Sequence, residues 1–369
     1  MTELRFAFPM DGVMLTRAVG REEGGKLQIT GIANALPGRN LTMNGVPMVF
    51  HSNIYSTVKP FGLASGRNTV ELCDTDTGEK QVIDVWYLPN AYMKYRFSLD
   101  DNIWFLQNLA KNQNVYKSMF EDPWLTLLKT MHDRYGTKFH VNIYYECPEF
   151  GGFNLTMLSD KFKDEWKYNS DWLRLSCHAN ANLPDHPYIQ ATYNQTYFEF
   201  KRVQDQILRF AGEEAFAGPV TTIHWGDATE DAVRAVRDLG IRCMVGSFMW
   251  GLPNDTTIAY HMNAEQCALL NIYGLYFDKK TDMMFFRYGG AAGGHSLQHG
   301  PLSEVAPGFS IFRAGHPYYP FRELCLHEEY FYPHYKAYMP DYYDRFETGI
   351  RWCVDNGYEP SFAREAFDL

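Results

Sequence analysis

From about residue 91 onward, apolar runs alternate with amphipathic runs, and this alternation most constrains what the chain can fold into. The amphipathic runs have the 3.6-residue period of helices and cover 102–111, 123–135, 191–211, 229–239 and 339–356. The apolar runs have the length of buried strands: Met93–Leu99, Phe139–Tyr145, Leu173–Cys177, Val220–Ile223, Ile241–Val245 and Leu324–Leu326. Strands that alternate with helices form parallel units. We therefore expect an α/β fold, a TIM-like (β/α) barrel of about seven strands that is whole or incomplete.

Residues 1–90 follow a different pattern, because they show no helical period. Short alternating runs, such as 27–31 and Gln81–Trp86, are separated by glycine and asparagine turn signals. Regularly spaced short strands are typical of a small all-β sandwich. Leu88-Pro89-Asn90 is a plausible boundary. We therefore predict a sandwich domain over 1–90 and a barrel over 91–369.

Composition and charge exclude several classes of function. The net charge is −10 and no Lys/Arg-rich run occurs, which argues against nucleic acid as a partner. No stretch approaches 18 apolar residues and the N-terminus has no apolar leader, so we expect neither membrane spanning nor export. The seven cysteines include no CxxC pair, which favours buried, reduced thiols and a cytoplasmic protein.

Chemically versatile residues stand where the predicted strands end. The first strand ends in Asp100-Asp101, and later strands end at His178, His224 and His327. In a (β/α) barrel the carboxyl ends of the strands form the active-site mouth, so these side chains should converge. One Asp and two neutral imidazoles suit a divalent ion with open positions, which would acidify a bound water. A further carboxylate and a further His could then act as base and acid.

Each of these residues also has a structural interpretation. Asp100-Asp101 could form a turn or cap the following helix. His178 could be a hydrogen-bonded core imidazole, and His224 could cap a helix or stack on Trp225. His327 could be a hydrogen-bonding surface group. Other residues that could reach the mouth or line a loop are Glu146, Glu149, His186, His295 and His299.

The order of these motifs resembles the polysaccharide deacetylase superfamily, the metal-dependent amide hydrolases of the chitooligosaccharide deacetylase type. The family's Thr-Phe-Asp-Asp-Gly motif corresponds here to Ser98-Leu99-Asp100-Asp101-Asn102. This resemblance implies that Asp100 is the general base and that Asp101 is a metal ligand. The family's last motif, Leu-x-x-His with an acidic neighbour, is similar to Leu324-Cys325-Leu326-His327-Glu328, which implies that His327 is the acid.

The family's second motif has two ligand histidines four residues apart. His178 matches the first of them, but Asn182 stands at the second position. Thr222-Ile223-His224 occupies the place of the third motif, and we infer that His224 supplies the missing ligand from the next strand. The resemblance covers about 92–350. The front strands are similar to the immunoglobulin-like or carbohydrate-binding-like sandwiches attached to many sugar-active enzymes.

The leading hypothesis is therefore a metal-dependent, deacetylase-like hydrolase of C–N amide bonds, acting on a carbohydrate or a small acylated substrate. The expected cofactor is a divalent metal ion, with Zn first and Co, Ni, Fe or Mn as alternatives. An oligomer is compatible with the sequence.

Two alternatives stay open. One is a glycoside hydrolase that uses paired carboxylates such as Glu146, Glu149 or Glu328 and needs no metal. The other is a catalytically inactive carbohydrate-binding barrel, which Asn182 would explain. It predicts that the rings of His178 and His224 do not converge.

Overall fold

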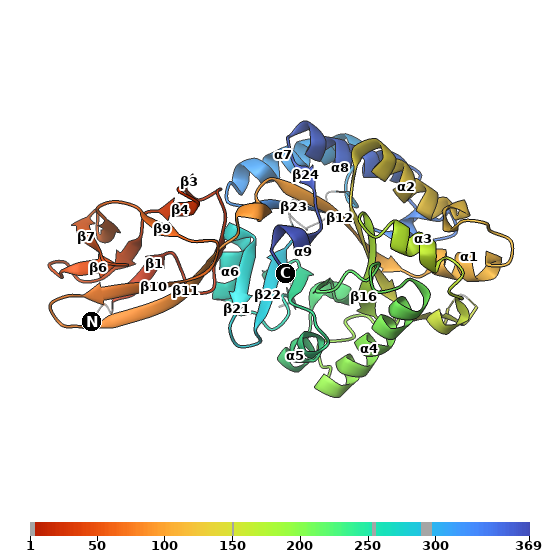
Figure 1. The fold of residues 1–369 in the computed structure, drawn as a ribbon, viewed down its shortest axis with the longest axis horizontal. Coiled ribbons are helices and arrows are strands. Elements are labelled where there is room, and N and C mark those ends of the chain that lie inside the picture. The colour runs from red at the N-terminus through yellow and green to blue at the C-terminus, as the bar shows by residue number, and fades with distance from the viewer. Residues whose placement is uncertain (1–3, 150, 253–255, 289–296) are drawn as a thin grey trace.

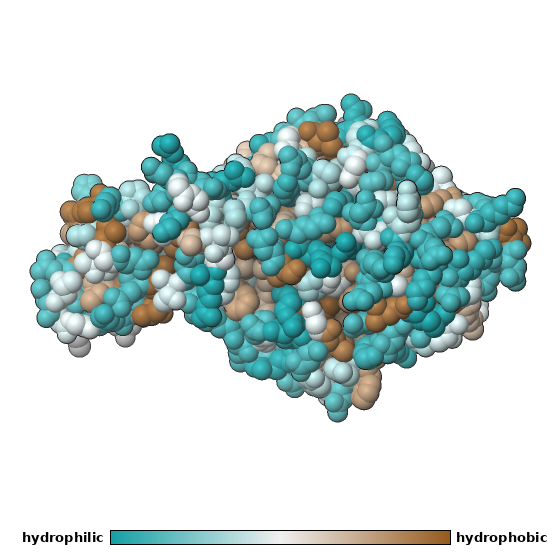
Figure 2. Space-filling view, viewed as in Figure 1, coloured by the Kyte–Doolittle hydropathy of each residue, from teal (hydrophilic) through white to brown (hydrophobic). Residues whose placement is uncertain are grey.

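The computed structural model describes residues 4–149, 151–252, 256–288 and 297–369. It is a mixed α/β structure in which the N-terminal strands project to one side of a larger region of helices packed around curved sheets (Figure 1). The face seen in Figure 2 is mainly hydrophilic, with hydrophobic residues in small scattered groups. None of the described helices is both long and apolar enough to cross a membrane.

The front of the chain is built from strands, as the turn-rich sequence predicts. An eight-stranded sheet has the order β1-β5-β8-β7-β6-β10-β11-β2, and β3, β4 and β9 form a second sheet. The strands are β1 (Arg5–Phe8), β2 (Met14–Leu15), β3 (Arg21–Glu23), β4 (Lys26–Ile29), β5 (Ile32–Asn34), β6 (Leu41–Met43), β7 (Val46–His51), β8 (Ile54–Thr57), β9 (Phe61–Leu63), β10 (Gly66–Asp74) and β11 (Lys80–Tyr87). One hydrophobic core runs from these strands into the rest of the chain, so the domain boundary near residue 90 stays a prediction.

The remaining strands include the six that the sequence predicts, in the predicted order, and most pair in parallel. They are β12 (Lys94–Asn102), β13 (Phe139–Tyr144), β14 (Glu146–Cys147), β15 (Phe153–Asn154), β16 (Leu173–Ala179), β17 (Val220–Thr221), β18 (Cys243–Gly246), β19 (Met249–Leu252), β20 (Thr256–Ile258), β21 (Leu275–Asp278), β22 (Met283–Arg287), β23 (Phe321–His327) and β24 (Glu359–Pro360). The parallel ladders are β16-β13-β12-β23 and β17-β18-β22, with β21 antiparallel on β22.

The two parallel ladders meet at β16 and β17. The hydroxyl of Thr221 donates to the carbonyl of Cys177 there, and Leu175 forms a single bridge with Phe216. On the other side, the rings of Phe286 on β22 and Phe321 on β23 contact each other at a centroid distance of 5.4 Å. Closure into one continuous barrel stays a prediction, because within the described residues the ladders of β22 and β23 do not join.

The helices cover the outside of the curved sheets (Figure 1). They are α1 (Trp104–Asn112), α2 (Pro123–Tyr135), α3 (Lys163–Tyr168), α4 (Tyr193–Phe210), α5 (Glu230–Asp238), α6 (Ala264–Tyr273), α7 (Val305–Gly315), α8 (Tyr342–Asp355) and α9 (Ala363–Ala366). The five predicted helices correspond to α1, α2, α4, α5 and α8. Local signals explain these bounds: Asp122 accepts hydrogen bonds from the first turn of α2, and Gly136 ends that helix in the left-handed conformation.

The region 252–321 resisted interpretation from sequence, and it contains α6, β21, β22 and α7. Among the described helices, α6 and α7 are apolar around much of their circumference, so no clear period marks them. The sequence also favours a loop at the glycine-rich run 289–294, which lies outside the described residues.

The interior of the β23-β12-β13-β16 sheet is polar instead of aliphatic. Alternate residues of β12 face inward, and Arg96 there pairs with Glu323 of β23 through two hydrogen bonds of 2.7 and 2.9 Å. Arg96 also donates to Nδ1 of His140, whose Nε2 contacts the hydroxyl of Ser176 at 2.7 Å. That hydroxyl donates to Asn142, whose amide donates to Asp100 at 2.6 Å. A hydrogen-bonded column therefore leads through the buried interior to the carboxyl end of β12.

The ion pair between Arg96 and Glu323, where this column begins, leads to a prediction about stability. Replacing Glu323 with Gln leaves the fully buried charge of Arg96 without its counter-ion, which should lower the free energy of unfolding by about 3–5 kcal/mol. Glu71→Gln, which breaks the exposed pair with Lys80, is the matched control and should cost no more than about 1 kcal/mol. Urea denaturation of both variants measures the difference, and equal shifts would contradict the interpretation.

Candidate metal centre

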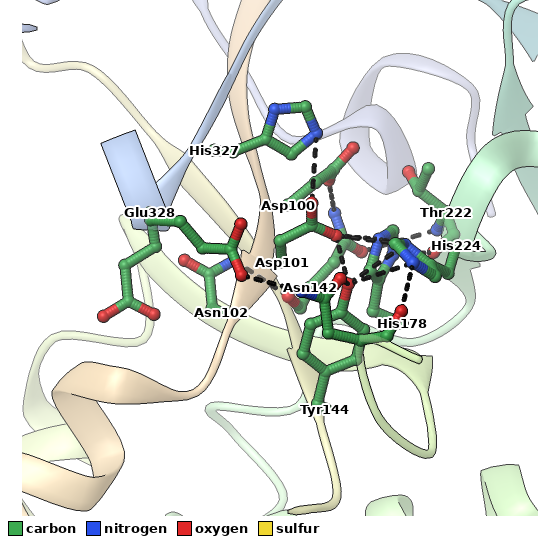
Figure 3. A network of polar contacts seen from close by, with 12 residues as sticks. Asp100, Asp101, Asn102, Asn142, Tyr144, His178, Thr222, His224, His327 and Glu328 are labelled. Atoms are coloured by element: carbon green, nitrogen blue, oxygen red, sulfur yellow. Dashed lines mark hydrogen bonds and ion pairs between the residues drawn. The ribbon is translucent and has the colours of Figure 1, made fainter. Parts of the chain in front are cut away.

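The predicted site residues meet at the carboxyl ends of the parallel strands. Asp100 and Asp101 end β12, His178 lies near the end of β16, His224 follows β17, and His327 ends β23. Figure 3 shows these side chains turned toward one another. The structure thus brings all five predicted residues together at one edge of the strands.

Neighbouring strand residues normally point to opposite sides, yet both carboxylates reach the same cavity. The reason is the backbone of Asp101, which has a φ of +59° in the left-handed region. The ladder between β12 and β13 shifts register between Leu99 and Asn102, which marks the local irregularity. Asp is among the residues that tolerate this conformation, and the usual alternation ends there.

Three potential ligand atoms form a close triangle. Oδ1 of Asp101 lies 3.0 Å from Nε2 of His178 and 3.0 Å from Nδ1 of His224. The two imidazole nitrogens are 3.2 Å apart. Donor atoms about 2.0–2.2 Å from a shared ion would have separations of this size. The rings therefore converge, contrary to what the inactive-barrel alternative predicts.

The far nitrogens of the two rings determine what the near nitrogens can do. Nδ1 of His178 lies 2.6 Å from the carbonyl of Thr222, and Nε2 of His224 lies 3.1 Å from the carbonyl of Asn182. A carbonyl only accepts, so each far nitrogen carries a proton. In the neutral rings both near nitrogens then present lone pairs to the Asp101 carboxylate. Either a proton on a near nitrogen or a cation between the three atoms balances this arrangement, and imidazoles that donate to backbone carbonyls are typical of metal ligands.

The electrostatics agree with a site for positive charge. Burial would raise the pKa of Asp101, but His327, His178 and His224 hold this pKa well below its usual value. Burial likewise disfavours charge on His178. Its hydrogen bond to Asp101 and the charges of Asp100 and Asp101 outweigh burial and raise the pKa of His178. An ionised carboxylate beside positive charge is thus the stable state of the cluster.

Asp100 lies beside the triangle, and four donors surround it. Its Oδ1 accepts from Asn142 at 2.6 Å and from Ser98 at 3.2 Å. Its Oδ2 accepts from the hydroxyl of Tyr288 at 3.2 Å and from the thiol of Cys325 at 3.5 Å. These contacts fix the orientation of a buried carboxylate that also lines the cavity.

His327 approaches the cluster from the opposite side. Its Nδ1 is 2.6 Å from the side-chain nitrogen of Gln298, which can only donate. The ring proton of a neutral His327 therefore sits on Nε2. That nitrogen is 3.6 Å from Oδ2 of Asp101 (Figure 3). The geometry presents an N–H group to the cavity.

Sequence reasoning missed Tyr144 at the end of β13. Its hydroxyl donates to Oδ1 of Asp101, lies 3.0 Å from Nδ1 of His224 and 3.2 Å from the side-chain oxygen of Asn182. Its position at a strand end was the available signal, because Phe139–Tyr145 was predicted as a strand. Asn182 does not replace the missing histidine, since its backbone carbonyl orients His224 instead.

A cavity of about 580 Å³ opens over the cluster. Its lining includes Glu329, which sequence reasoning also missed. Glu329 accepts a 3.0 Å hydrogen bond from the side chain of Asn182, and burial together with the charge of Asp101 raises its pKa to about 7. A carboxyl group that is partly protonated near neutral pH thus faces the same space as an ionised one.

The other predicted residues have varied positions. Glu328 points away from the cluster (Figure 3) and accepts hydrogen bonds from the backbone N–H groups of Ile103, Trp104 and Phe105 at the start of α1. Its use as a catalytic carboxylate is therefore a wrong prediction, because the N-terminus of α1 holds it. The remaining candidates are Glu146, which accepts from Asn180; Glu149, which is exposed; His186, which stacks on Trp225; His299, which lines the cavity; and His295, which lies outside the described residues.

No family model and no curated protein matches the chain. A 4-alpha-glucanotransferase from Thermococcus litoralis is similar in structure, with a TM-score of 0.49 and 12% identity over 75% of this chain and 40% of that one. A polysaccharide deacetylase from Bacillus cereus has a TM-score of 0.34 and 11% identity, over 74% of this chain and 93% of that one. A peptidoglycan N-acetylglucosamine deacetylase has a TM-score of 0.34 and 9% identity, over 76% and 91%.

The chain thus matches less than half of the glucanotransferase. At such low identities and scores none of these likenesses bears on the chemistry of the site.

The pKa of Glu328 gives a prediction of pH dependence. Burial raises this pKa from 4.5 to about 8, although Tyr332 and the N–H groups of Ile103 and Phe105 oppose the change. Between pH 5 and 8 the folded state therefore binds more protons at Glu328 than the unfolded state does. The free energy of unfolding should fall as the pH rises, by up to about 1.4 kcal/mol per pH unit from this group.

Glu328→Gln should abolish this contribution, since the amide does not titrate. Urea denaturation of the natural protein and the variant at pH 5, 6, 7 and 8 tests the expectation. The natural protein should lose stability relative to the variant across this range, and a pH-independent difference would rule the assignment out.

Proposed function

We propose that the chain is a metal-dependent hydrolase of C–N amide bonds, deacetylase-like, that acts on a carbohydrate or a small acylated substrate. One observation carries the proposal: the lone pairs of His178 and His224 converge with the Asp101 carboxylate at 3.0–3.2 Å, while the far ring nitrogens are engaged by backbone carbonyls. Asp101, His178 and His224 would hold the ion, and Tyr144 would orient Asp101. The mixed nitrogen and oxygen donors suit Zn first, with Co, Ni, Fe or Mn as alternatives.

When bound, a divalent ion lowers the pKa of a water molecule and polarises a carbonyl oxygen. Asp100 would accept the proton of that water, because its carboxylate lines the same cavity and is fixed by Asn142 and Tyr288. The doubly protonated His327 would donate its Nε2 proton to the leaving nitrogen and become the neutral ring, whose Nδ1 lies 2.6 Å from the side-chain amide of Gln298. Acid and base thus approach the centre from β12 and β23, which are adjacent strands.

Loss of a ligand should remove the metal. In His178→Gln and His224→Gln, metal content measured by mass spectrometry should fall from about one equivalent toward zero. Activity should fall by more than the roughly 10–100-fold that loss of a supporting hydrogen bond costs. His51→Gln, at an exposed strand end, is the matched control and should keep its metal. Unchanged metal content in both site variants would refute the proposal.

Loss of the acid or base should instead leave the metal in place. Asp100→Asn and His327→Gln should each lower kcat by about 10²–10⁴-fold, the usual contribution of a positioned proton-transfer group. Metal content should stay at about one equivalent. Loss of metal from either variant would show that the replaced residue is a metal ligand instead of the acid or base.

A second candidate function rests on Glu329. The pKa of Glu329 is about 7, whereas the pKa of Asp101 lies well below its usual value. A glycoside hydrolase requires two such carboxyl groups, one protonated as the acid and one ionised as the base. This alternative needs no metal. Activity on a glycosidic bond that survives a chelator and is lost in Glu329→Gln would favour it, and sensitivity to the chelator would exclude it.

A further inference from the structure

A second cavity of about 350 Å³ adjoins the cavity over the cluster. Tyr144 lines this second cavity, and its hydroxyl donates to Asp101 in the cluster. Five residues line both cavities: Asn182, Leu183, Glu329, Tyr335 and Lys336. The two cavities therefore form one space, which we call the extended cleft. A substrate that is cleaved at the cluster has room to continue into the second cavity.

Carboxylates outnumber basic side chains in the extended cleft. Its described lining contains six of them: Asp100, Asp101, Glu146, Glu149, Asp185 and Glu329. Lys336 is the one lysine of this described lining, which contains no arginine. A bound divalent ion would offset Asp100 and Asp101, so four carboxylates remain against one lysine. A cleft lined by charge of one sign attracts ligands of the opposite sign.

Other protein groups leave much of this negative charge uncompensated. Glu149 is exposed, and it has no hydrogen bond or ion pair with another described residue. Burial and then the charges of Asp101 and Glu149 raise the pKa of Glu329 to about 7. The carboxylates of the extended cleft thus disfavour one another's ionised forms, and a cation placed between them would relieve this repulsion.

Aromatic residues line the second cavity together with the carboxylates. Trp104 and Tyr335 are among them, and their rings meet nearly edge to face at a centroid distance of 5.6 Å. The side chain of Tyr335 is hydrogen-bonded to Glu329. Aromatic rings attract organic cations, and carboxylates supply the counter-charge. A neutral ligand would instead desolvate these carboxylates without compensation.

We propose that the substrate of the extended cleft is an acylated amine that carries a second, protonated amino group, such as a monoacylated diamine. This inference rests on the proposed hydrolase function and names its substrate class. The amide would lie at the cluster, and the ammonium group would lie in the second cavity beside Glu149 and Glu329. Water would add across the C–N bond, which gives the carboxylic acid and the free diamine.

The test first measures binding apart from turnover. Chelator-treated protein is titrated in a calorimeter at pH 8, above the pKa of Glu329, with N-acetylputrescine. The neutral probe is N-pentylacetamide, in which a methyl group replaces the ammonium group. The natural protein should bind N-acetylputrescine about ten-fold more tightly or better, and added salt should reduce the difference because it screens the charges.

Two variants of opposite sign locate the cation. Glu149→Gln should weaken the binding of N-acetylputrescine by about three- to ten-fold, because one partly screened attraction is lost. Lys336→Gln should strengthen this binding, because it removes a like charge from the extended cleft. Neither variant should change the binding of N-pentylacetamide. Glu265→Gln, at an exposed position of α6 outside the extended cleft, is the matched control and should change neither affinity.

Three results would overturn the inference: no binding of N-acetylputrescine, equal affinity for the two probes, or unchanged N-acetylputrescine binding in both cleft variants. Tighter binding of the neutral disaccharide N,N′-diacetylchitobiose than of N-acetylputrescine would also overturn it.

Turnover by the zinc-loaded protein separates this inference from the proposed hydrolase. Release of putrescine from N-acetylputrescine should show a raised KM and a nearly unchanged kcat in Glu149→Gln. Metal-dependent hydrolysis of neutral amides with no preference for the cation would keep the hydrolase and overturn the inference. Cation binding that depends on Glu149, without any metal-dependent amide hydrolysis, would refute the hydrolase and leave a cation-binding cleft.

Discussion

The buried ion pair between Arg96 and Glu323 is the interaction on which the site depends. It joins β12 and β23 near their starts and fixes their register, in which Asp100 lies beside His327 four residues later. Charges taken out of water are costly unless they are paired and hydrogen-bonded, so neither strand can slip without exposing an uncompensated charge. The proposed base and the proposed acid are therefore placed opposite each other by a contact well below the cavity.

From that pair the polar column continues through His140 and Ser176 to Asn142 and Asp100. Branched apolar side chains usually fill such an interior, and on the β18 and β22 side the apolar core is formed by Cys243, Val245, Met284 and Phe286. The interior thus has a polar half and an apolar half, and the two halves act differently. Hydrogen bonds have preferred directions, so the polar half orients the proposed catalytic groups, whereas apolar packing in the other half buries surface without fixing the orientation of any one group.

Sequence reasoning found Asp100, Asp101, His178, His224 and His327 because parallel strands end at one edge, and this rule needs no knowledge of side-chain contacts. It could not find the role of Tyr144, because a tyrosine at the end of an apolar run looks like core. Glu328 and Glu329 were indistinguishable in the sequence. In the structure the side chain of Glu328 lies at the N-terminus of α1, whereas the side chain of the next residue, Glu329, lines the cavity.

The sequence by itself determined the order of the six predicted strands and five predicted helices, the change of pattern near residue 90 and the residues at the predicted strand ends, because periodicity and turn signals are local. The tertiary structure alone decided that Asp101 turns into the left-handed region, so that adjacent carboxylates share one cavity. It also decided that His224 approaches His178 to 3.2 Å where Asn182 offers only a backbone carbonyl. Both results come from distances between segments far apart in the chain, and no local pattern encodes such distances.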